Sequence, residues 1–205
     1  MRRSNCILFI KMMILSTLAF SCRGLNDRKV DPVVIAHAKA VIDSNFLHSP
    51  YLQVAQYDFN TAWLYIIAPE NSFWLDGRST GHQFCKFVGE ELVDYVRQVF
   101  RLAKDGSETY IMGLSMGGFG ALHTAFAYPE TFGKVAALSS ALIVHEVAGM
   151  SEGQGNATAN YEYYRECFGE TSEVLNSRNN PEFLIDELQR EGKNIPDIFM
   201  CCGTE

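Results

Sequence analysis

The stretch that decides the fold of this chain is residues 109–130, TYIMGLSMGGFGALHTAFAYPE. It begins with a short apolar run, 109–112, that predicts a strand. A glycine-rich turn follows over 113–120, and the apolar residues beyond it predict a helix that reaches Tyr128, where Pro129 stops it. A strand, a tight turn and a helix in this order are typical of one unit of an α/β fold.

The turn within this unit has the pattern Gly-x-Ser-x-Gly over residues 113–117. A serine on so tight a turn takes a strained backbone conformation, and Gly113 and Gly117 are needed because a side chain there would meet the neighbouring strand or helix. The turn lifts the hydroxyl of Ser115 above the sheet and directs the amide of Met116 toward a developing oxyanion. The pattern therefore predicts a nucleophilic serine. The alternative is a glycine-rich turn whose serine caps the helix.

The rest of the chain alternates predicted strands with predicted helices. A continuous apolar run over residues 63–68 is typical of a strand buried on both faces of a parallel sheet. This alternation predicts an α/β domain with a mostly parallel sheet and helices on both faces. The other expected elements are strands at 135–138 and 198–202 and helices at 31–42, 84–100 and 180–192.

Composition and charge limit the class of protein and the kind of partner. Apolar residues make up 47% of the 205 residues, which is enough for one domain with a buried core. The formal net charge is −7 and no basic run follows Arg2-Arg3, which argues against a nucleic-acid surface. The six cysteines have no spacing typical of a zinc site, so we expect no metal and no disulfide framework. Cys201 and Cys202 stand in an apolar run and are expected to be buried.

The first 22 residues support two interpretations. Met1-Arg2-Arg3 and the short apolar stretch after it are typical of a signal peptide, although Lys11 interrupts the stretch and it is too short to span a bilayer. A buried strand of the sheet explains the same residues. The protein is therefore expected to be either cytoplasmic or exported through a weak N-terminal signal, without a stable membrane span.

Three motifs together resemble a known group of enzymes. They are NSFWLDG at 71–77, FVGEEL at 87–92 and GLSMGGFGALHTAFAYPETFGKVAALSSAL at 113–142. Over residues 62–205 the chain is similar to the tributyrin esterase, S-formylglutathione hydrolase (esterase D) and feruloyl esterase group of α/β-hydrolases. This group is related to the antigen 85 acyltransferases.

The resemblance implies a serine hydrolase of small carboxylic esters that needs no cofactor. It matches Ser115 to the nucleophile that forms the acyl-enzyme and Met116 to one donor of the oxyanion hole. Members of the group continue past a segment like Cys-Gly-Thr-Glu with the catalytic aspartate and histidine, whereas this chain stops at Glu205 inside that segment. We therefore expect residues 23–205 to be a partial α/β-hydrolase domain, incomplete at its C-terminus and impaired in hydrolysis. The alternative is a non-catalytic α/β-hydrolase-like protein that binds a ligand or partner.

Two aromatic residues and an insertion are candidates for the substrate pocket. Phe73 and Trp74 follow a predicted strand, at the edge where α/β sheets bind ligands, so they are candidate walls of the pocket. Packing beneath a loop explains them equally well. Residues 149–180 are polar and include three tyrosines at 161–164, which predicts a cap-like insertion over the site.

The two histidines that follow Ser115 have different expected roles. His145 comes soon after the loop at 139–140 and is a candidate pocket residue or base. His123 lies about 12 Å along the predicted helix at 1.5 Å per residue, too far to reach the hydroxyl, so we expect it to pack against the core. The sequence does not predict the oligomeric state.

Overall fold

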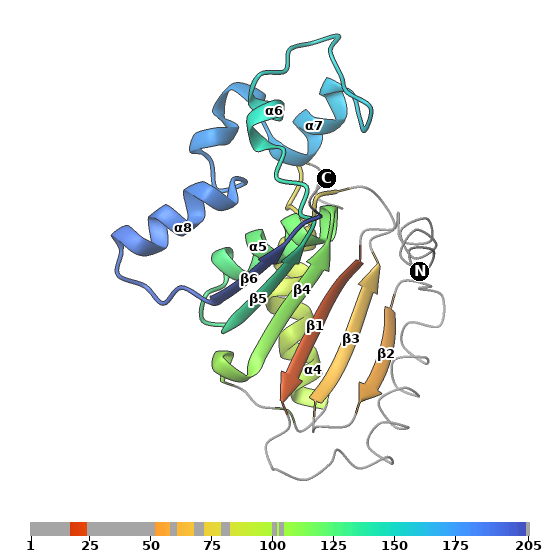
Figure 1. Ribbon diagram of the computed structural model, residues 1–205, viewed down its shortest axis with the longest axis vertical. Helices are drawn as coiled ribbons and strands as arrows, with labels where there is room; N and C mark the ends of the chain where they lie inside the picture. Colours follow the sequence, from red (N-terminus) through yellow and green to blue (C-terminus); the bar gives the residue numbers. More distant parts are fainter. Residues whose placement is uncertain are drawn as a thin grey trace, which may run out of the picture.

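One mixed sheet organises the molecule, which is described from a computed structural model (Figure 1). The described residues are 17–23, 52–57, 61–67, 72–78, 83–99, 102 and 105–203. The strand order is β2-β3-β1-β4-β5-β6. The strands are β1 (Thr17–Arg23), β2 (Leu52–Tyr57), β3 (Thr61–Ile67), β4 (Thr109–Leu114), β5 (Lys134–Leu138) and β6 (Asp197–Cys201).

The strand directions explain where the site forms. β4, β5 and β6 pair in parallel, while β1 lies antiparallel between β3 and β4. β3 therefore runs in the same direction as β4, β5 and β6, and β1 and β2 run against them. The α/β-hydrolase fold predicted from the sequence is confirmed, and the carboxyl ends of these four strands lie at one edge of the sheet. The strand expected at 63–68 is present as β3, but both of its neighbours are antiparallel because β1 separates it from β4.

Part of the N-terminal region forms a strand. Residues 17–23 are β1, which agrees with the second interpretation of residues 1–22. Export of the chain stays a prediction.

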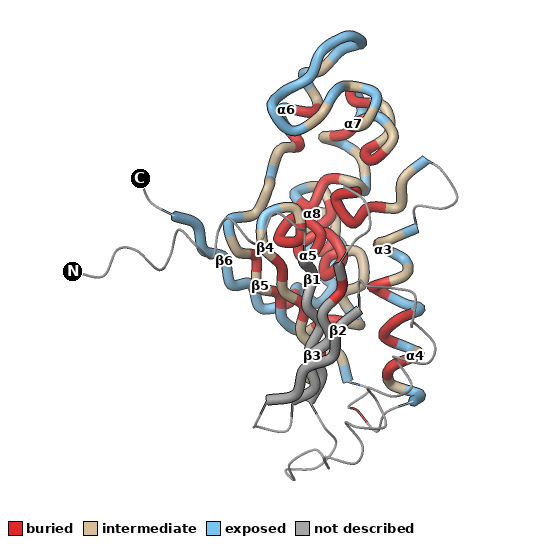
Figure 2. The backbone as a smooth tube through the Cα atoms, turned by 90° about the vertical axis from the view of Figure 1, so that its right-hand side faces the viewer, coloured by how far each residue is buried: buried red, intermediate tan, exposed pale blue. Residues whose placement is uncertain are grey.

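The described helices that pack against the sheet lie on one of its faces (Figure 2), whereas the sequence predicts helices on both. The helix expected at 84–100 is present as a run of three segments, α3 (Phe84–Lys86), a π-helical turn η1 (Phe87–Glu91) and α4 (Leu92–Val99). Its buried stripe includes Val88, Leu92 and Val96, which join the main core. The helix expected at 31–42 lies outside the described residues. In the described part of the chain, no helix is both long enough and apolar enough to span a bilayer.

The helix after the glycine-rich turn, α5 (Met116–Ala127), is the most deeply buried element. Every residue from 117 to 126 is buried. A helix that is apolar on all sides is stable only when other elements surround it, and α5 packs against β4, β5 and α8 (Pro181–Arg190).

A helical segment lies beyond the carboxyl edge of the sheet, at the top of Figure 1. It contains α6 (Val144–Ala148), α7 (Tyr161–Phe168) and the 3-10 helix η3 (Thr171–Asn176); a further 3-10 helix, η2 (Gly106–Glu108), precedes β4. Asn160 caps α7, with its side-chain oxygen accepting the amide of Tyr163 at 3.0 Å. Asn180 caps α8 in the same way, by accepting the amide of Glu182 at 3.0 Å. The helix expected at 180–192 is thereby confirmed. We use the name cap for residues 144–180; the role predicted for residues 149–180, a cap-like insertion over the site, stays a prediction.

The last strand corrects one expectation. All five residues of β6 are exposed, and so are Cys201 and Cys202, which the sequence predicts to be buried. Among the described strands β6 pairs with β5 alone, and the described helices leave much of its surface open. Apolar sequence alone therefore does not bury this strand.

Candidate active site

Ser115 lies between β4 and α5, where the motif predicts it. Its backbone angles are φ 56° and ψ −118°, and the residue is exposed. A positive φ is costly for a residue with a side chain, and such strain concentrates at functional sites. The turn therefore presents the hydroxyl at the carboxyl edge of the sheet at the expense of local backbone energy.

The backbone of Ser115 is held on both sides by the end of β5. Its amide donates to the carbonyl oxygen of Leu138 at 2.9 Å, and its own carbonyl oxygen accepts the amide of Ala141 at 3.0 Å. Ser139, between these two partners, also has a positive φ, of 42°, and its amide donates to the carbonyl of Cys201 at 2.7 Å. The segment 138–141 thus fixes the turn. The Gly-x-Ser-x-Gly motif does not predict this role for residues 138–141. The small residues Ser-Ser-Ala after the adjacent parallel strand are the sequence feature that indicates it.

Two glycines permit the close contacts of the turn. A Cβ on Gly113 would overlap the carbonyl oxygen of Gly117, and one on Gly118 would overlap the hydroxyl of Ser140. Gly117 itself is buried. The structure therefore shows a steric limit at Gly113 of the motif, while the same requirement at Gly117 stays a prediction.

Strained residues gather at the same edge. Among the described residues, the non-glycine residues with positive φ are Phe73, Trp74, Ser115 and Ser139. They follow β3, β4 and β5, whose carboxyl ends lie at one edge of the sheet. Ligands of α/β sheets bind outside these ends. The distribution of strain therefore points to the site that the motif predicts.

The amide of Met116 is suited to bind an oxyanion. Met116 is the first residue of α5, and the first amides of a helix have no carbonyl partner within it. The helix dipole places partial positive charge at the same end. The side chain of Met116 packs in a cluster with Phe119, Val144 and Phe168, which we call the cap cluster, and this packing helps to hold the amide in position. Its role in catalysis stays a prediction.

Phe73 and Trp74 are buried rather than open to solvent. Their exposed fractions are 2% and 1%. The ring of Phe73 packs edge-on against Phe119, with 5.4 Å between centroids, and also contacts Phe168 at 5.0 Å. Trp74 lies against Gly120, where a Cβ would come within 2.5 Å of it. The structure thus places both residues in packing beneath the site, and a role in walling a pocket stays a prediction.

The two histidines lie in different environments. His145, on α6, is exposed, and its Nε2 lies 3.1 Å from a carboxylate oxygen of Glu182. No hydrogen bond joins it to Ser115 among the described residues. His123 is 4% exposed, which agrees with the packed position expected for it. Within the described part of the chain, no group of three His, Cys, Asp or Glu side chains could hold a metal ion.

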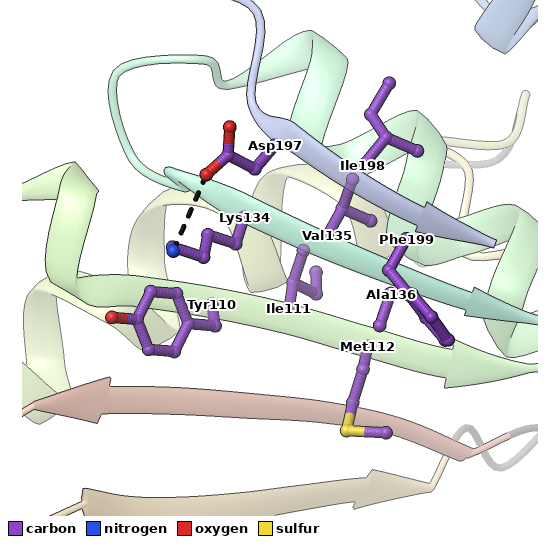
Figure 3. A pocket seen from close by; sticks show the side chains of 9 residues that line it. All are labelled: Tyr110, Ile111, Met112, Lys134, Val135, Ala136, Asp197, Ile198 and Phe199. Atoms are coloured by element: carbon purple, nitrogen blue, oxygen red, sulfur yellow. Dashed lines mark ion pairs between the residues drawn. The ribbon is translucent and has the colours of Figure 1, made fainter.

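A hollow of about 300 Å³ lies elsewhere, on the sheet (Figure 3). Side chains of β4, β5 and β6 line it, and the ion pair between Lys134 and Asp197, 3.5 Å apart, stands at one end. Tyr110, Lys134 and Asp197 are in register near the amino ends of their strands, whereas Ser115 follows the carboxyl end of β4. The hollow is therefore separate from the strained edge that carries the serine.

The chain matches known proteins along most of its length. The model of the family described as "Putative esterase" matches residues 40–189. An acetyl esterase of Caldicellulosiruptor saccharolyticus is 40% identical over 147 residues, which cover 72% of this chain and 55% of that protein.

Solved structures agree with the sequence relatives. The substrate-bound fluorophosphonate-binding serine hydrolase FphF of Staphylococcus aureus is 26% identical, with a TM-score of 0.57 over 69% of this chain and 51% of that one. MPT51 of Mycobacterium tuberculosis is 17% identical, with a TM-score of 0.54 over 93% of this chain and 69% of that one, and shows likeness of fold alone.

The chain spans about half the length of the acetyl esterase and of FphF. The matched part includes the strained serine turn and the helix that follows it. The family match covers well over half of the chain, and the relative at 40% identity agrees with it. This chain therefore belongs to the family described as putative esterases and has the α/β-hydrolase fold.

Proposed function

We propose that this chain is the nucleophile-bearing part of a carboxylesterase that acts on small esters. The observation that carries the proposal is the exposed Ser115 on a strained strand-to-helix turn at the carboxyl edge of the sheet. The similarity to an acetyl esterase supports a short acyl group.

The reaction follows from the groups at the turn. The hydroxyl oxygen of Ser115 bonds to the ester carbonyl carbon, its proton passes to a base, and the carbonyl oxygen becomes an oxyanion that the amide of Met116 stabilises. The bond to the alcohol oxygen then breaks, and the alcohol leaves with the proton. Water attacks the acyl-enzyme in the second half of the reaction and releases the carboxylic acid.

The described residues supply only some of the groups that this chemistry needs. A serine esterase requires a nucleophile, a base, an orienting acid and two oxyanion donors. Ser115 and the Met116 amide are candidates for two of these groups. The candidate base that the sequence offers among the described residues, His145, is paired with Glu182 instead. We therefore expect the 205-residue chain to hydrolyse 4-nitrophenyl acetate slowly or not at all.

A chimera tests the proposal. The chain is fused to the part of the acetyl esterase that follows the matched region, and hydrolysis of 4-nitrophenyl acetate is measured. We expect the chimera to be at least ~10³-fold faster than the chain alone, the scale of a restored triad member. Ser115→Ala should remove this gain without unfolding the domain. The matched control Ser107→Ala, at an exposed serine before the amino end of the same strand, should retain it. Turnover that survives Ser115→Ala would show that another group is the nucleophile.

The competing function is a non-catalytic α/β-hydrolase-like protein that binds a ligand or partner. The observation in its favour is that no hydrogen bond connects Ser115 to His145 among the described residues. A folded chimera that binds an ester analogue but shows neither turnover nor acylation of Ser115 would favour this function.

A further inference from the structure

His123 lies on α5, the helix that follows Ser115, and both of its ring nitrogens form hydrogen bonds to residues other than Ser115. Its Nε2 lies 2.8 Å from the carbonyl oxygen of Arg178, and its Nδ1 lies 3.4 Å from the sulfur of Cys85. A carbonyl oxygen can only accept, so Nε2 carries the hydrogen and donates it. Nδ1 is then the acceptor, and the thiol of Cys85 is the donor.

The burial of both groups keeps them in the protonation states that this arrangement needs. Burial lowers the pKa of His123 to about 4 and outweighs the hydrogen bond to the carbonyl of Arg178, which raises the pKa, so the imidazole is neutral near pH 7. Burial, with the carboxylate of Asp76, raises the pKa of the Cys85 thiol to about 12, so the thiol keeps its hydrogen. One face of the imidazole stacks on Phe119, with 6.3 Å between ring centroids.

The hydrogen-bond partners of His123 belong to two separate segments. Cys85 is in α3, which follows the loop that carries Phe73 and Trp74. Arg178 is in the turn that closes the cap between η3 and α8. That turn is tied back into the cap, because the side-chain amide of Asn179 donates to the carbonyl of Phe168 at 3.0 Å and that of Asn180 donates to the carbonyl of Leu175 at 2.9 Å. A single bond from His123 thus reaches a turn to which α7, η3 and α8 are all connected.

We infer that His123 is a positioning residue that fastens the closing turn of the cap to α5. The contact itself does not depend on the proposed function. Only its consequence for catalysis, the position of the cap relative to Ser115, rests on that proposal. The cap cluster includes Met116 and Phe119 from α5. A fixed cap therefore helps to hold the amide of Met116 and the turn at Ser115 in their positions. His123 acts on the reaction through this contact and does not touch the substrate.

The test compares two replacements in the 205-residue chain. In His123→Gln the side-chain amide can still donate to the carbonyl of Arg178, whereas His123→Phe keeps a flat ring but offers no donor. Hydrogen exchange is measured for residues 161–180 and for β4 and β5. We expect exchange in 161–180 to be about tenfold faster in His123→Phe, the scale of one lost hydrogen bond, and close to wild type in His123→Gln. Exchange in β4 and β5 should be the same in all three proteins.

Other outcomes overturn the inference. Equal exchange in His123→Phe and wild type would show that the bond does not hold the cap, and a uniform rise that includes β4 and β5 would show a general core residue. If His123→Phe does not fold, nitrogen NMR of the wild-type chain still decides, because the inference requires a neutral imidazole with its hydrogen on Nε2 at pH 7. A charged ring, or a hydrogen on Nδ1, would contradict it. Neither readout uses an ester, so failure of the esterase proposal and failure of this one are distinguishable.

Discussion

Two apolar segments of this chain, α5 and β6, meet opposite environments in the structure. All residues of α5 from 117 to 126 are buried, whereas all five residues of β6 are exposed, and Phe199 shows 60% of its surface. Phe119 of α5 contacts the rings of Phe73 and Phe168. In the described part of the sheet β6 is the edge strand and pairs with β5 alone. An apolar sequence therefore leads to burial only where other elements of the fold pack against it.

The sharpest test of this comparison replaces one phenylalanine in each segment. Phe119→Ala should lower the free energy of unfolding by about 3–5 kcal/mol, because it leaves a cavity in a fully buried aromatic cluster. Phe199→Ala, the matched control, should change it by less than about 0.5 kcal/mol because the ring is mostly exposed. Urea unfolding followed by circular dichroism measures both. A similar loss in the two variants would mean that another surface covers β6 in solution.

A smaller effect is expected in the pH dependence of stability, and it comes from a histidine on the buried helix α5. The pKa of His123 falls from an ordinary 6.5 to about 4 in the fold because the ring is buried. Between these values the unfolded chain binds a proton that the folded chain does not. Keeping His123 neutral therefore contributes to the free energy of unfolding above pH 6.5. This contribution, about 3 kcal/mol in total, is lost as the pH falls to about 4.

The measurement for this prediction is urea unfolding at a series of pH values between 7 and 4. The glutamine of His123→Gln cannot take up a proton. Its free energy of unfolding should therefore fall less steeply with decreasing pH than that of wild type, by the equivalent of about one bound proton. Identical slopes in His123→Gln and wild type would show that the ring titrates alike in the folded and unfolded chain.

The smallest effect is expected at the start of β6. Lys134 and Asp197 form an ion pair 3.5 Å long whose side chains are 54% and 81% exposed. Water and salt screen such a pair, so a double-mutant cycle of Lys134→Ala and Asp197→Ala should give a coupling below about 1 kcal/mol that fades in 1 M salt. A larger, salt-resistant coupling would indicate that the hollow beside this pair is covered in solution.

Local sequence signals predicted the central elements well. The run 109–130 predicted β4, the serine turn and α5, because strand propensity, the glycine spacing and Pro129 all act over a few residues. Asn180-Pro181 predicted the start of α8 for the same reason. β2 was missed, since residues 44–60 show no clear period, and the π-helical turn within the helix expected at 84–100 has no local signal that we recognised.

The sequence by itself determined the strained serine turn and the family, since the motif restricts backbone geometry within five residues and needs no distant partner. Only the tertiary structure decided that Phe73 and Trp74 are buried beneath the turn, that residues 138–141 hold Ser115, and that Cys201 is exposed. It also decided that His123 connects α3, α5 and the cap. Each of these depends on which surfaces meet after the chain folds, and contacts between residues far apart in sequence leave no periodic pattern in the residues that make them.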